Sequence, residues 1–255
     1  MKISVITVAY NSANTIEHTL HSIASQSYPE IEHVVVDGAS SDDTLAIIQR
    51  QTRQPDTLIS EPDHGIYDAM NKGIRASRGE IVGFLNSDDL FAHDDALADI
   101  ARIFTDPTVD ACYGDLVYVS RDNSTVVRYW RSKPFSKGRF ARGWCPPHPT
   151  FYVRKSAINR LGLFNTDFRL AADAEFLMRY LEVGGIRVDY IPEVLVRMRL
   201  GGATNNSFAN IINQNREILR ALTLNKISFN TFNFVFRKLL DRVFQYYFWR
   251  NQYAD

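Results

Sequence analysis

The sequence contains little cysteine. Two of its 255 residues are cysteines, Cys112 and Cys145, and no CxxC pair occurs. Two isolated cysteines supply neither a disulfide framework nor the sulfur ligands of a structural zinc site. This usage is typical of a reducing compartment, and we expect a cytoplasmic protein.

Long apolar runs are also missing. No stretch approaches the roughly 20 apolar residues that a membrane-spanning helix requires. The run at residues 3–8 is too short for the apolar region of a secretory signal, and no cleavage site follows it. These residues therefore predict a first β-strand, and a contact with the inner face of the cell membrane would have to be peripheral.

A surplus of charge of one sign is absent as well. The 29 lysines and arginines balance 29 aspartates and glutamates, so the formal net charge at pH 7 is +0. Nucleic-acid binders that depend on bulk electrostatic attraction carry a basic surplus. We therefore expect no nucleic-acid partner.

Glycine is absent where nucleotide-binding proteins often need it. Residues 9–14 follow the first predicted strand without a glycine, and no Walker A motif occurs. This excludes the loops that hold phosphates on glycine-rich backbone. A nucleotidyltransferase usually has such a loop, and we keep that activity only as an alternative.

Apolar runs and helical stripes alternate over the first 104 residues, which predicts parallel strands joined by helices. Beyond them the pattern favours antiparallel strands, a long loop and helices. We predict strands at 3–8, 31–36, 57–59, 81–85, 111–119, 125–130, 150–153 and within 186–200, a loop at 132–149, and later helices at 172–183, 211–222 and 231–249. The fold class is α/β, a mixed sheet flanked by helices, with parts at 1–104 and 105–200 and a helical C-terminal extension at 201–255.

Polar side chains follow three of the predicted parallel strands. They are Tyr10 with Asn11, Asp37, and the run Asn86-Ser87-Asp88-Asp89. The carboxyl ends of parallel strands meet at one edge of a sheet, where α/β proteins bind nucleotides. Asp88 with a divalent cation, Mn²⁺ or Mg²⁺, would neutralise phosphates there. The alternative is that Asp88 and Asp89 only cap the following helix.

Four segments carry a family resemblance. Residues 3–11, 34–44, 63–73 and 84–89 occur in the order and at the spacing of family 2 glycosyltransferases with the GT-A fold. The sequence resembles, within that family, bacterial enzymes that build surface polysaccharides and glycolipids. The resemblance implies an inverting transfer of a sugar from a UDP-, GDP- or dTDP-sugar to a glycan or lipid-linked acceptor. A nucleotide-sugar-binding module without catalysis is the second alternative.

The resemblance also assigns roles to residues. It places the nucleotide on Ala9, Tyr10, Asn11, Asp37, Asp68, Lys72 and Ser87, with Asp37 on the base and Asp68 and Lys72 near the ribose and phosphates. Asp88 would hold the metal, assisted by Asn86, which replaces the usual first acid of the Asp-x-Asp motif. His148 lies where relatives often have a histidine in the acceptor region, and it is a second metal candidate. A rigid proline-rich turn around His148 is the alternative.

Asp173 matches the aspartate of the family's catalytic motif, while Ala172 stands where glutamate is frequent. An inverting transfer needs such a base to take the proton of the acceptor hydroxyl. The alternative is an ordinary acid in the first turn of a helix, favoured by the helix dipole. Both can hold, because a base at a helix start is well fixed in position.

Three further residues are candidates for diphosphate or acceptor contacts: Arg197, Arg199 and Trp144. A solvated strand edge and a core aromatic are the alternatives. The aromatic and basic segment 231–250 could lie on a membrane surface, pack on the catalytic domain, or form a homodimer contact.

Overall fold

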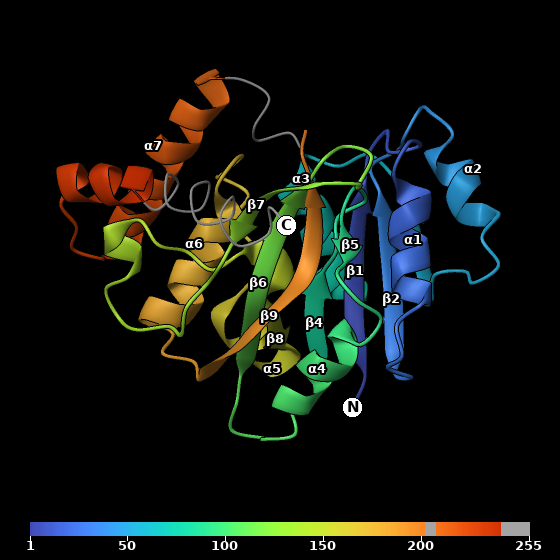
Figure 1. Cartoon of the computed structure of the whole chain (residues 1–255), viewed down its shortest axis with the longest axis horizontal. Coiled ribbons are helices and arrows are strands. Elements are labelled where there is room, and N and C mark those ends of the chain that lie inside the picture. The colour runs from blue at the N-terminus through green and yellow to red at the C-terminus, as the bar shows by residue number, and fades with distance from the viewer. Residues whose placement is uncertain (202–207, 241–255) are drawn as a thin grey trace.

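The computed structural model describes residues 1–201 and 208–240, and these contain one mixed sheet (Figure 1). The strand order is β3-β2-β1-β4-β8-β6-β9-β5, and β7 pairs with β6. The strands are β1 (Ile3–Ala9), β2 (Ile31–Asp37), β3 (Thr57–Ser60), β4 (Ile81–Phe84), β5 (Leu90–Phe91), β6 (Ala111–Val119), β7 (Val126–Trp130), β8 (Tyr152–Arg154) and β9 (Val188–Arg199). The predicted α/β class and mixed sheet are confirmed.

The first four strands are parallel, so their carboxyl ends lie at one edge of the sheet, where the sequence predicts a nucleotide site. Both β1 and β2 are buried at every position, as expected for strands covered on both faces. Ala9 pairs with Asp37 at the ends of these two strands. Strand β4 runs beside β1, with Ile6 opposite Phe84, so the chain leaves β4 toward the same edge.

The second half extends this sheet. Strand β6 is buried along its whole length, runs antiparallel to β7 and β8, and runs parallel to β9. The antiparallel pairing of 111–119 with the following strand was expected and is confirmed. The short strand β5 was not predicted, because its two residues carry no periodic signal. It pairs with β9 and so links the chain after Asp89 to the second half.

Helices cover the two faces of the sheet (Figure 1). They are α1 (Ile16–Ala24), α2 (Thr44–Gln49), α3 (Ile66–Ala76), α4 (Ala96–Ile103), α5 (Lys155–Leu161), α6 (Ala172–Met178) with a π-helical continuation at Arg179–Val183, and α7 (Phe208–Leu224), besides 3-10 turns at Phe140–Arg142 and His148–Thr150. Residues 231–240 are also helical, and the rest of the predicted 231–249 helix lies outside the described residues. None of the described helices is long and apolar enough to cross a bilayer.

One hydrophobic core joins the three predicted parts of the chain. It contains Ile6 and Val34 from the parallel half, Phe164 and Phe176 from the second half, and Phe234 from the C-terminal helix. The predicted boundaries at residues 104 and 200 therefore lie within one packed core. The separate functions predicted for the three parts stay a prediction.

Candidate active site

The turn after β4 places four polar residues at the common edge of the parallel strands. Ser87 fixes this turn against the first loop, because its N–H donates to Val8 O at 3.3 Å and its hydroxyl lies 2.8 Å from the hydroxyl of Ser12. The next helix begins only at Ala96, with Asp95 at its N-cap. The alternative that Asp88 and Asp89 cap that helix is therefore wrong, because strand β5 comes between.

Two buried oxygen atoms in this turn have no hydrogen-bond partner: Asn86 Oδ1 and Asp89 Oδ1. The Asn86 amide N–H instead donates to the other oxygen of Asp89, at 3.3 Å. Burial raises the pKa of Asp88, and burial together with the charge of Asp88 raises the pKa of Asp89 well above its usual value. A cation bound beside these oxygens would offset the desolvation of their charged form, as protonation does in its absence.

The donor set of this turn fits a hard divalent cation. Mg²⁺ prefers carboxylate and carbonyl oxygens, and proteins often hold it with one or two carboxylates plus the phosphates of a substrate. The oxygens of Asp88 and Asn86 satisfy that description. Among the described residues, a separate cluster of His93, Asp99 and Glu193 brings three possible ligands within 4.8 Å of one another, and it includes neither Asp88 nor His148.

A pocket of about 290 Å³ lies beside Asp88, between the start of α1 and the end of β9. Arg199 lines it, is 6% exposed, and has no hydrogen-bond partner on Nε or Nη1. Its positive charge acts on Asp88 and Asp89 against the effect of burial. Arg121, from the β6–β7 turn, lines the same pocket and was not singled out by the sequence. The two guanidinium groups suit an anion such as a diphosphate.

Arg197 lies two residues before Arg199 on the same strand, but its guanidinium is hydrogen-bonded within the protein. Its Nε and Nη2 donate to the side-chain and main-chain oxygens of Asn123, both at 3.0 Å. These bonds hold the β6–β7 turn onto β9. Arg197 therefore holds a turn and is not simply the solvated strand edge of the alternative, whereas Arg199 lines the pocket beside Asp88.

The loop after β1 supplies an exposed aromatic face. Ala9 is buried at the strand end, whereas the side chain of Tyr10 is 66% exposed. Asn11 adopts a positive φ of 49°, accepts the N–H of Ser41 on its side-chain oxygen at 2.9 Å, and donates its own N–H to the hydroxyl oxygen of Ser40 at 2.9 Å. The loop is thus tied to the one after β2, and it presents Tyr10 to solvent at the sheet edge.

Asp37 is fully buried at the end of β2. Its carboxylate accepts the hydroxyl and the N–H of Ser40, the latter at 3.1 Å, and the hydroxyl of Ser60 at 2.7 Å. A side chain at Gly38 would place its Cβ 2.4 Å from the carboxylate of Asp63 and 3.4 Å from the ring of Tyr10. Asp63 therefore lies beside Tyr10 and Asp37, a proximity that the sequence pattern did not indicate.

Helix α3 carries the next two predicted residues on one face. Lys72 donates to Glu61 at 2.8 Å and to Pro62 O at 2.7 Å, and it lies 3.9 Å from Asp68. The hydrogen bond with Glu61 raises the pKa of Lys72. Asp68 in turn accepts the N–H of His64 at 3.1 Å. Asp68 and Lys72 together order the loop that leads into the helix.

Two other residues of α3, Tyr67 and Asn71, face the second half of the chain. Tyr67 donates its hydroxyl to Asp173 at 3.1 Å. Burial raises the pKa of Tyr67 well above 10, so this hydroxyl remains a donor. Asn71, one helical turn later, exchanges two hydrogen bonds of 2.9 Å with the backbone of Phe164. One helix thus carries Asp68 and Lys72, which the resemblance assigns to the nucleotide, and the hydrogen-bond partner of the predicted base.

The segment before Asp173 is held by a distant acid. Glu217, on α7, accepts the N–H groups of Arg169, Leu170 and Ala171 at 2.8–3.1 Å. Asp173 follows in the first turn of α6. No local signal in the sequence connects Glu217 with this segment, because the contact spans more than 40 residues.

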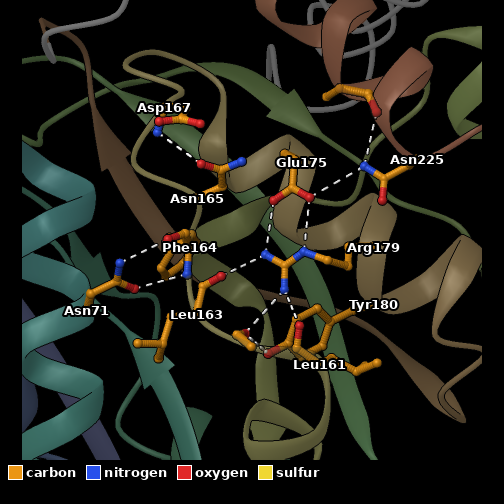
Figure 2. A network of polar contacts seen from close by, with 12 residues as sticks. Asn71, Leu161, Leu163, Phe164, Asn165, Asp167, Glu175, Arg179, Tyr180 and Asn225 are labelled. Carbon is orange, nitrogen blue, oxygen red and sulfur yellow. Dashed lines mark hydrogen bonds and ion pairs between the residues drawn. The ribbon is translucent and has the colours of Figure 1, made fainter.

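Figure 2 shows how α6 itself is anchored. Arg179 makes a two-pronged ion pair with Glu175, at 2.9 and 3.0 Å, and donates to the carbonyls of Leu161 and Leu163. Asn71 holds the next residue, Phe164, from the other side. The helix that carries Asp173 is therefore fixed to both α3 and the segment after α5.

His148 lies on the Asp173 side of the sheet. Its ring stacks on Phe84 at 5.4 Å and meets Phe164 edge-on at 5.7 Å, and its Nε2 has no partner. Burial lowers the pKa of His148, which the negative charge of Asp173 opposes. We thus expect a neutral imidazole at pH 7. The two aromatic contacts hold the ring in one position, and the assignment of His148 to the acceptor stays a prediction.

Trp144 belongs to an aromatic cluster with Tyr113, Phe135 and Phe140, whose ring centroids lie 5.7–6.3 Å from its own. Its indole N–H is buried without a partner. The core alternative therefore describes most of this side chain, and the unpaired N–H is the group that a ligand could still use.

Comparison with known proteins agrees with this arrangement. The family model for glycosyl transferase family 2 matches residues 4–168. An uncharacterized glycosyltransferase of Mycobacterium tuberculosis strain H37Rv is 33% identical over 184 residues, which cover 69% of this chain and 68% of the relative. A PGL/p-HBAD biosynthesis glycosyltransferase of Mycobacterium bovis strain BCG is 28% identical over 225 residues, covering 87% and 84%.

Solved structures share the fold at low sequence identity. S. aureus TarS 1–349 in complex with UDP-GlcNAc has a TM-score of 0.69 and 21% identity, and the match covers 100% of this chain and 73% of the TarS 1–349 chain. The mannosyltransferase PcManGT from Pyrobaculum calidifontis, in complex with GDP-Man and Mn²⁺, has a TM-score of 0.67 and 24% identity, covering 96% and 69%. The fold is GT-A, as the sequence predicted. With a family model that matches most of its length, the chain belongs to glycosyl transferase family 2.

Proposed function

We propose that the chain is an inverting, metal-assisted glycosyltransferase that uses a nucleotide-diphosphate sugar. The observation that carries this proposal is the Asp88 turn. It gathers the partnerless oxygens Asn86 Oδ1 and Asp89 Oδ1 near Arg199, a buried arginine whose Nε and Nη1 have no hydrogen-bond partner, at the sheet edge that also presents Tyr10. A cation and a diphosphate would satisfy both sets of atoms, because each supplies the charge that the other lacks.

The donor would lie along this edge. Its base and ribose would contact Ala9, Tyr10 and Asn11, with Asp37 on the base, and its phosphates would reach Ser87 and Lys72. Asp68 would act beside Lys72 at the ribose. The solved relatives are recorded with UDP-GlcNAc and with GDP-Man, and we propose a nucleotide sugar of this kind for the present chain.

Asp88 and the Asn86 carbonyl oxygen would hold Mn²⁺ or Mg²⁺. Such an ion offsets the charge that develops on the departing diphosphate. Arg199 would contact the same diphosphate from the pocket beside Asp88. Its guanidinium is already buried next to this turn, so it needs no large movement to reach the ligand.

Asp173 would act as the general base. Its hydrogen bond with Tyr67 and the anchored start of α6 fix one carboxylate oxygen and leave the other for the acceptor hydroxyl. The hydroxyl oxygen would attack the anomeric carbon as the bond to the diphosphate breaks, and Asp173 would take the released proton. An attack from the face opposite the leaving group inverts the anomeric configuration.

The acceptor would be a glycan or a lipid-linked glycan, met at the inner face of the cell membrane. The M. bovis relative is a PGL/p-HBAD biosynthesis glycosyltransferase, and we propose that the present chain likewise acts in the biosynthesis of a larger glycoconjugate. The region around His148 and the indole N–H of Trp144 would form part of the acceptor site.

A thermal-shift panel of UDP, GDP and dTDP with and without Mn²⁺ tests the donor site. We expect one nucleotide to stabilise the protein, and more strongly with Mn²⁺. The sugar released from the matching donor in water then reports the stereochemistry by NMR, and we expect the inverted anomer first. Pyrophosphate release from a nucleoside triphosphate and a sugar phosphate would instead identify a nucleotidyltransferase. Tight donor binding with neither hydrolysis nor transfer would favour a binding module.

A further inference from the structure

The C-terminal helix at residues 231–240 presents its apolar side to solvent. Phe232 is 81% exposed, and the same face carries Val235, Phe236, Leu239 and Leu240, all exposed. Their spacing of three and four residues makes one continuous stripe. Soluble monomers rarely expose such a stripe, so it requires a partner.

The same helix already uses its other side for packing. Phe234 is 2% exposed within the main core, and Lys238 donates to Asn215 at 2.7 Å. At 100° per residue, Phe234 and Lys238 lie opposite the centre of the apolar stripe. The helix is thus fixed to the protein through one face, and the predicted packing accounts for that face alone.

A basic segment lies beside the helix. A Cβ at Gly143 would lie 3.0 Å from both the Lys238 side chain and Phe234 O, so the helix rests directly on the end of the 131–143 loop. Figure 1 shows the two segments side by side at one end of the molecule. Residues 131–142 contain five lysines or arginines and no acid. Two acids outside the loop contact its backbone: Glu182 accepts the N–H of Gly138 and Asp115 accepts the N–H of Ser132, each at 2.7 Å.

Charge is also segregated along the chain as a whole. The first 100 residues contain 16 acids and 6 lysines or arginines, whereas the rest contain 13 acids and 23 lysines or arginines. The zero net charge is therefore the sum of an acidic segment at residues 1–100 and a basic segment at residues 101–255. An apolar stripe flanked by exposed basic side chains has the composition of a surface that binds anionic lipid.

We propose that the exposed stripe of 231–240 and the basic loop 131–142 together dock on an anionic lipid bilayer. The stripe would enter the headgroup region while Lys137 and Arg142, both exposed, pair with lipid phosphates. This inference extends the proposed function by saying where a lipid-linked acceptor would be met, but its evidence is independent of the donor site.

Vesicle flotation of the full chain tests the proposal. We expect binding to phosphatidylglycerol–phosphatidylcholine vesicles and little binding to phosphatidylcholine alone. Phe236→Asp should weaken binding about tenfold or more, because it replaces an exposed aromatic side chain that would enter the headgroup region with a negative charge. Asn233→Asp is the matched control: it adds the same charge on the same helix outside the stripe, and we expect a much smaller loss.

Neutralising the loop tests the electrostatic part. Lys137→Gln and Arg142→Gln should each weaken binding to anionic vesicles about fivefold, and added salt should do the same. Equal flotation of the wild type and Phe236→Asp, or none by the wild type, would overturn the proposal. So would a wild-type dimer that Phe236→Asp converts to a monomer in light scattering while neither protein floats. Nucleotide thermal shifts on the same samples show whether the donor site is intact.

Discussion

The Asp88 turn and the Asp173 helix are built in opposite ways. Around Asp88, the atoms Asn86 Oδ1, Asp89 Oδ1 and Arg199 Nε are buried and unpaired. Around Asp173, hydrogen bonds reach the helix start and its neighbours from α3, α6 and α7. The first region is incomplete without a ligand, whereas the second is fixed in advance. The contrast suggests a division of labour, with binding energy drawn from the first region and chemistry from the second.

Asp173→Asn should have the largest effect, because it should abolish most of the chemistry without affecting binding. We expect the turnover rate to fall by roughly 10²–10⁴-fold, the usual contribution of a general base, while nucleotide binding stays unchanged. Steady-state kinetics with the preferred donor measures this. Asp167→Asn, an exposed acid earlier on the same segment, is the control and should keep full activity. An active Asp173→Asn enzyme would refute the assignment of the base.

Asn86→Asp should strengthen metal binding at the Asp88 turn, because it restores the first acid of the family's Asp-x-Asp motif. A further negative charge beside Asp88 should raise Mn²⁺ affinity on the order of tenfold and lower the melting temperature of the metal-free protein. Calorimetric titration of Mn²⁺ and melting in EDTA measure the two effects. The exposed change Asn233→Asp should produce neither. Unchanged Mn²⁺ affinity would mean that residue 86 lies outside the metal's ligand shell.

The pH dependence of stability should also separate the two regions. Burial raises the pKa of Asp88 and Asp89 above the ordinary value of 3.8. A carboxyl with a raised folded-state pKa favours the fold most below its unfolded pKa, and this contribution is lost as the pH rises through the folded value. The metal-free protein should therefore lose stability over that interval, and Mn²⁺ should restore it by binding the ionised groups.

Melting curves across pH in EDTA and in Mn²⁺ would measure this interval. Asp88→Asn removes one of the two titrating groups, so its stability should vary less with pH than that of the wild type. Identical profiles for the two proteins would show that the turn does not control the pH dependence.

Tyr67→Phe should have the smallest effect of the four changes. It removes the hydroxyl that donates to Asp173 at 3.1 Å, one of the contacts that fix the position of this carboxylate. We expect a loss of a few fold in the turnover rate at neutral pH, with nucleotide affinity unchanged. Tyr113→Phe, which loses a buried hydroxyl bond to Lys133 O, should leave the turnover rate in place. An unchanged turnover rate in Tyr67→Phe would assign the bond a structural role alone.

The sequence predicted the Asp88 region better than the Asp173 region, for a physical reason. Strand ends meet at one edge whenever parallel strands pair, so Tyr10, Asp37 and Asp88 could be placed together from the pattern of strands alone. The support of Asp173 comes from Tyr67 and Glu217, which are distant in sequence and have no pattern that links them to it. The sequence also could not show that Arg197 binds the β6–β7 turn while Arg199 lines the pocket, because this depends on where that turn packs.

The most direct test titrates the preferred nucleoside diphosphate into the wild type, Asp88→Asn and Asp173→Asn, each with and without Mn²⁺. We predict that the wild type and Asp173→Asn bind equally and gain affinity from Mn²⁺, whereas Asp88→Asn loses that gain, by about tenfold or more. If Asp88→Asn kept the full Mn²⁺ effect, or if Asp173→Asn lost it, the assignment of binding to one region and chemistry to the other would be contradicted.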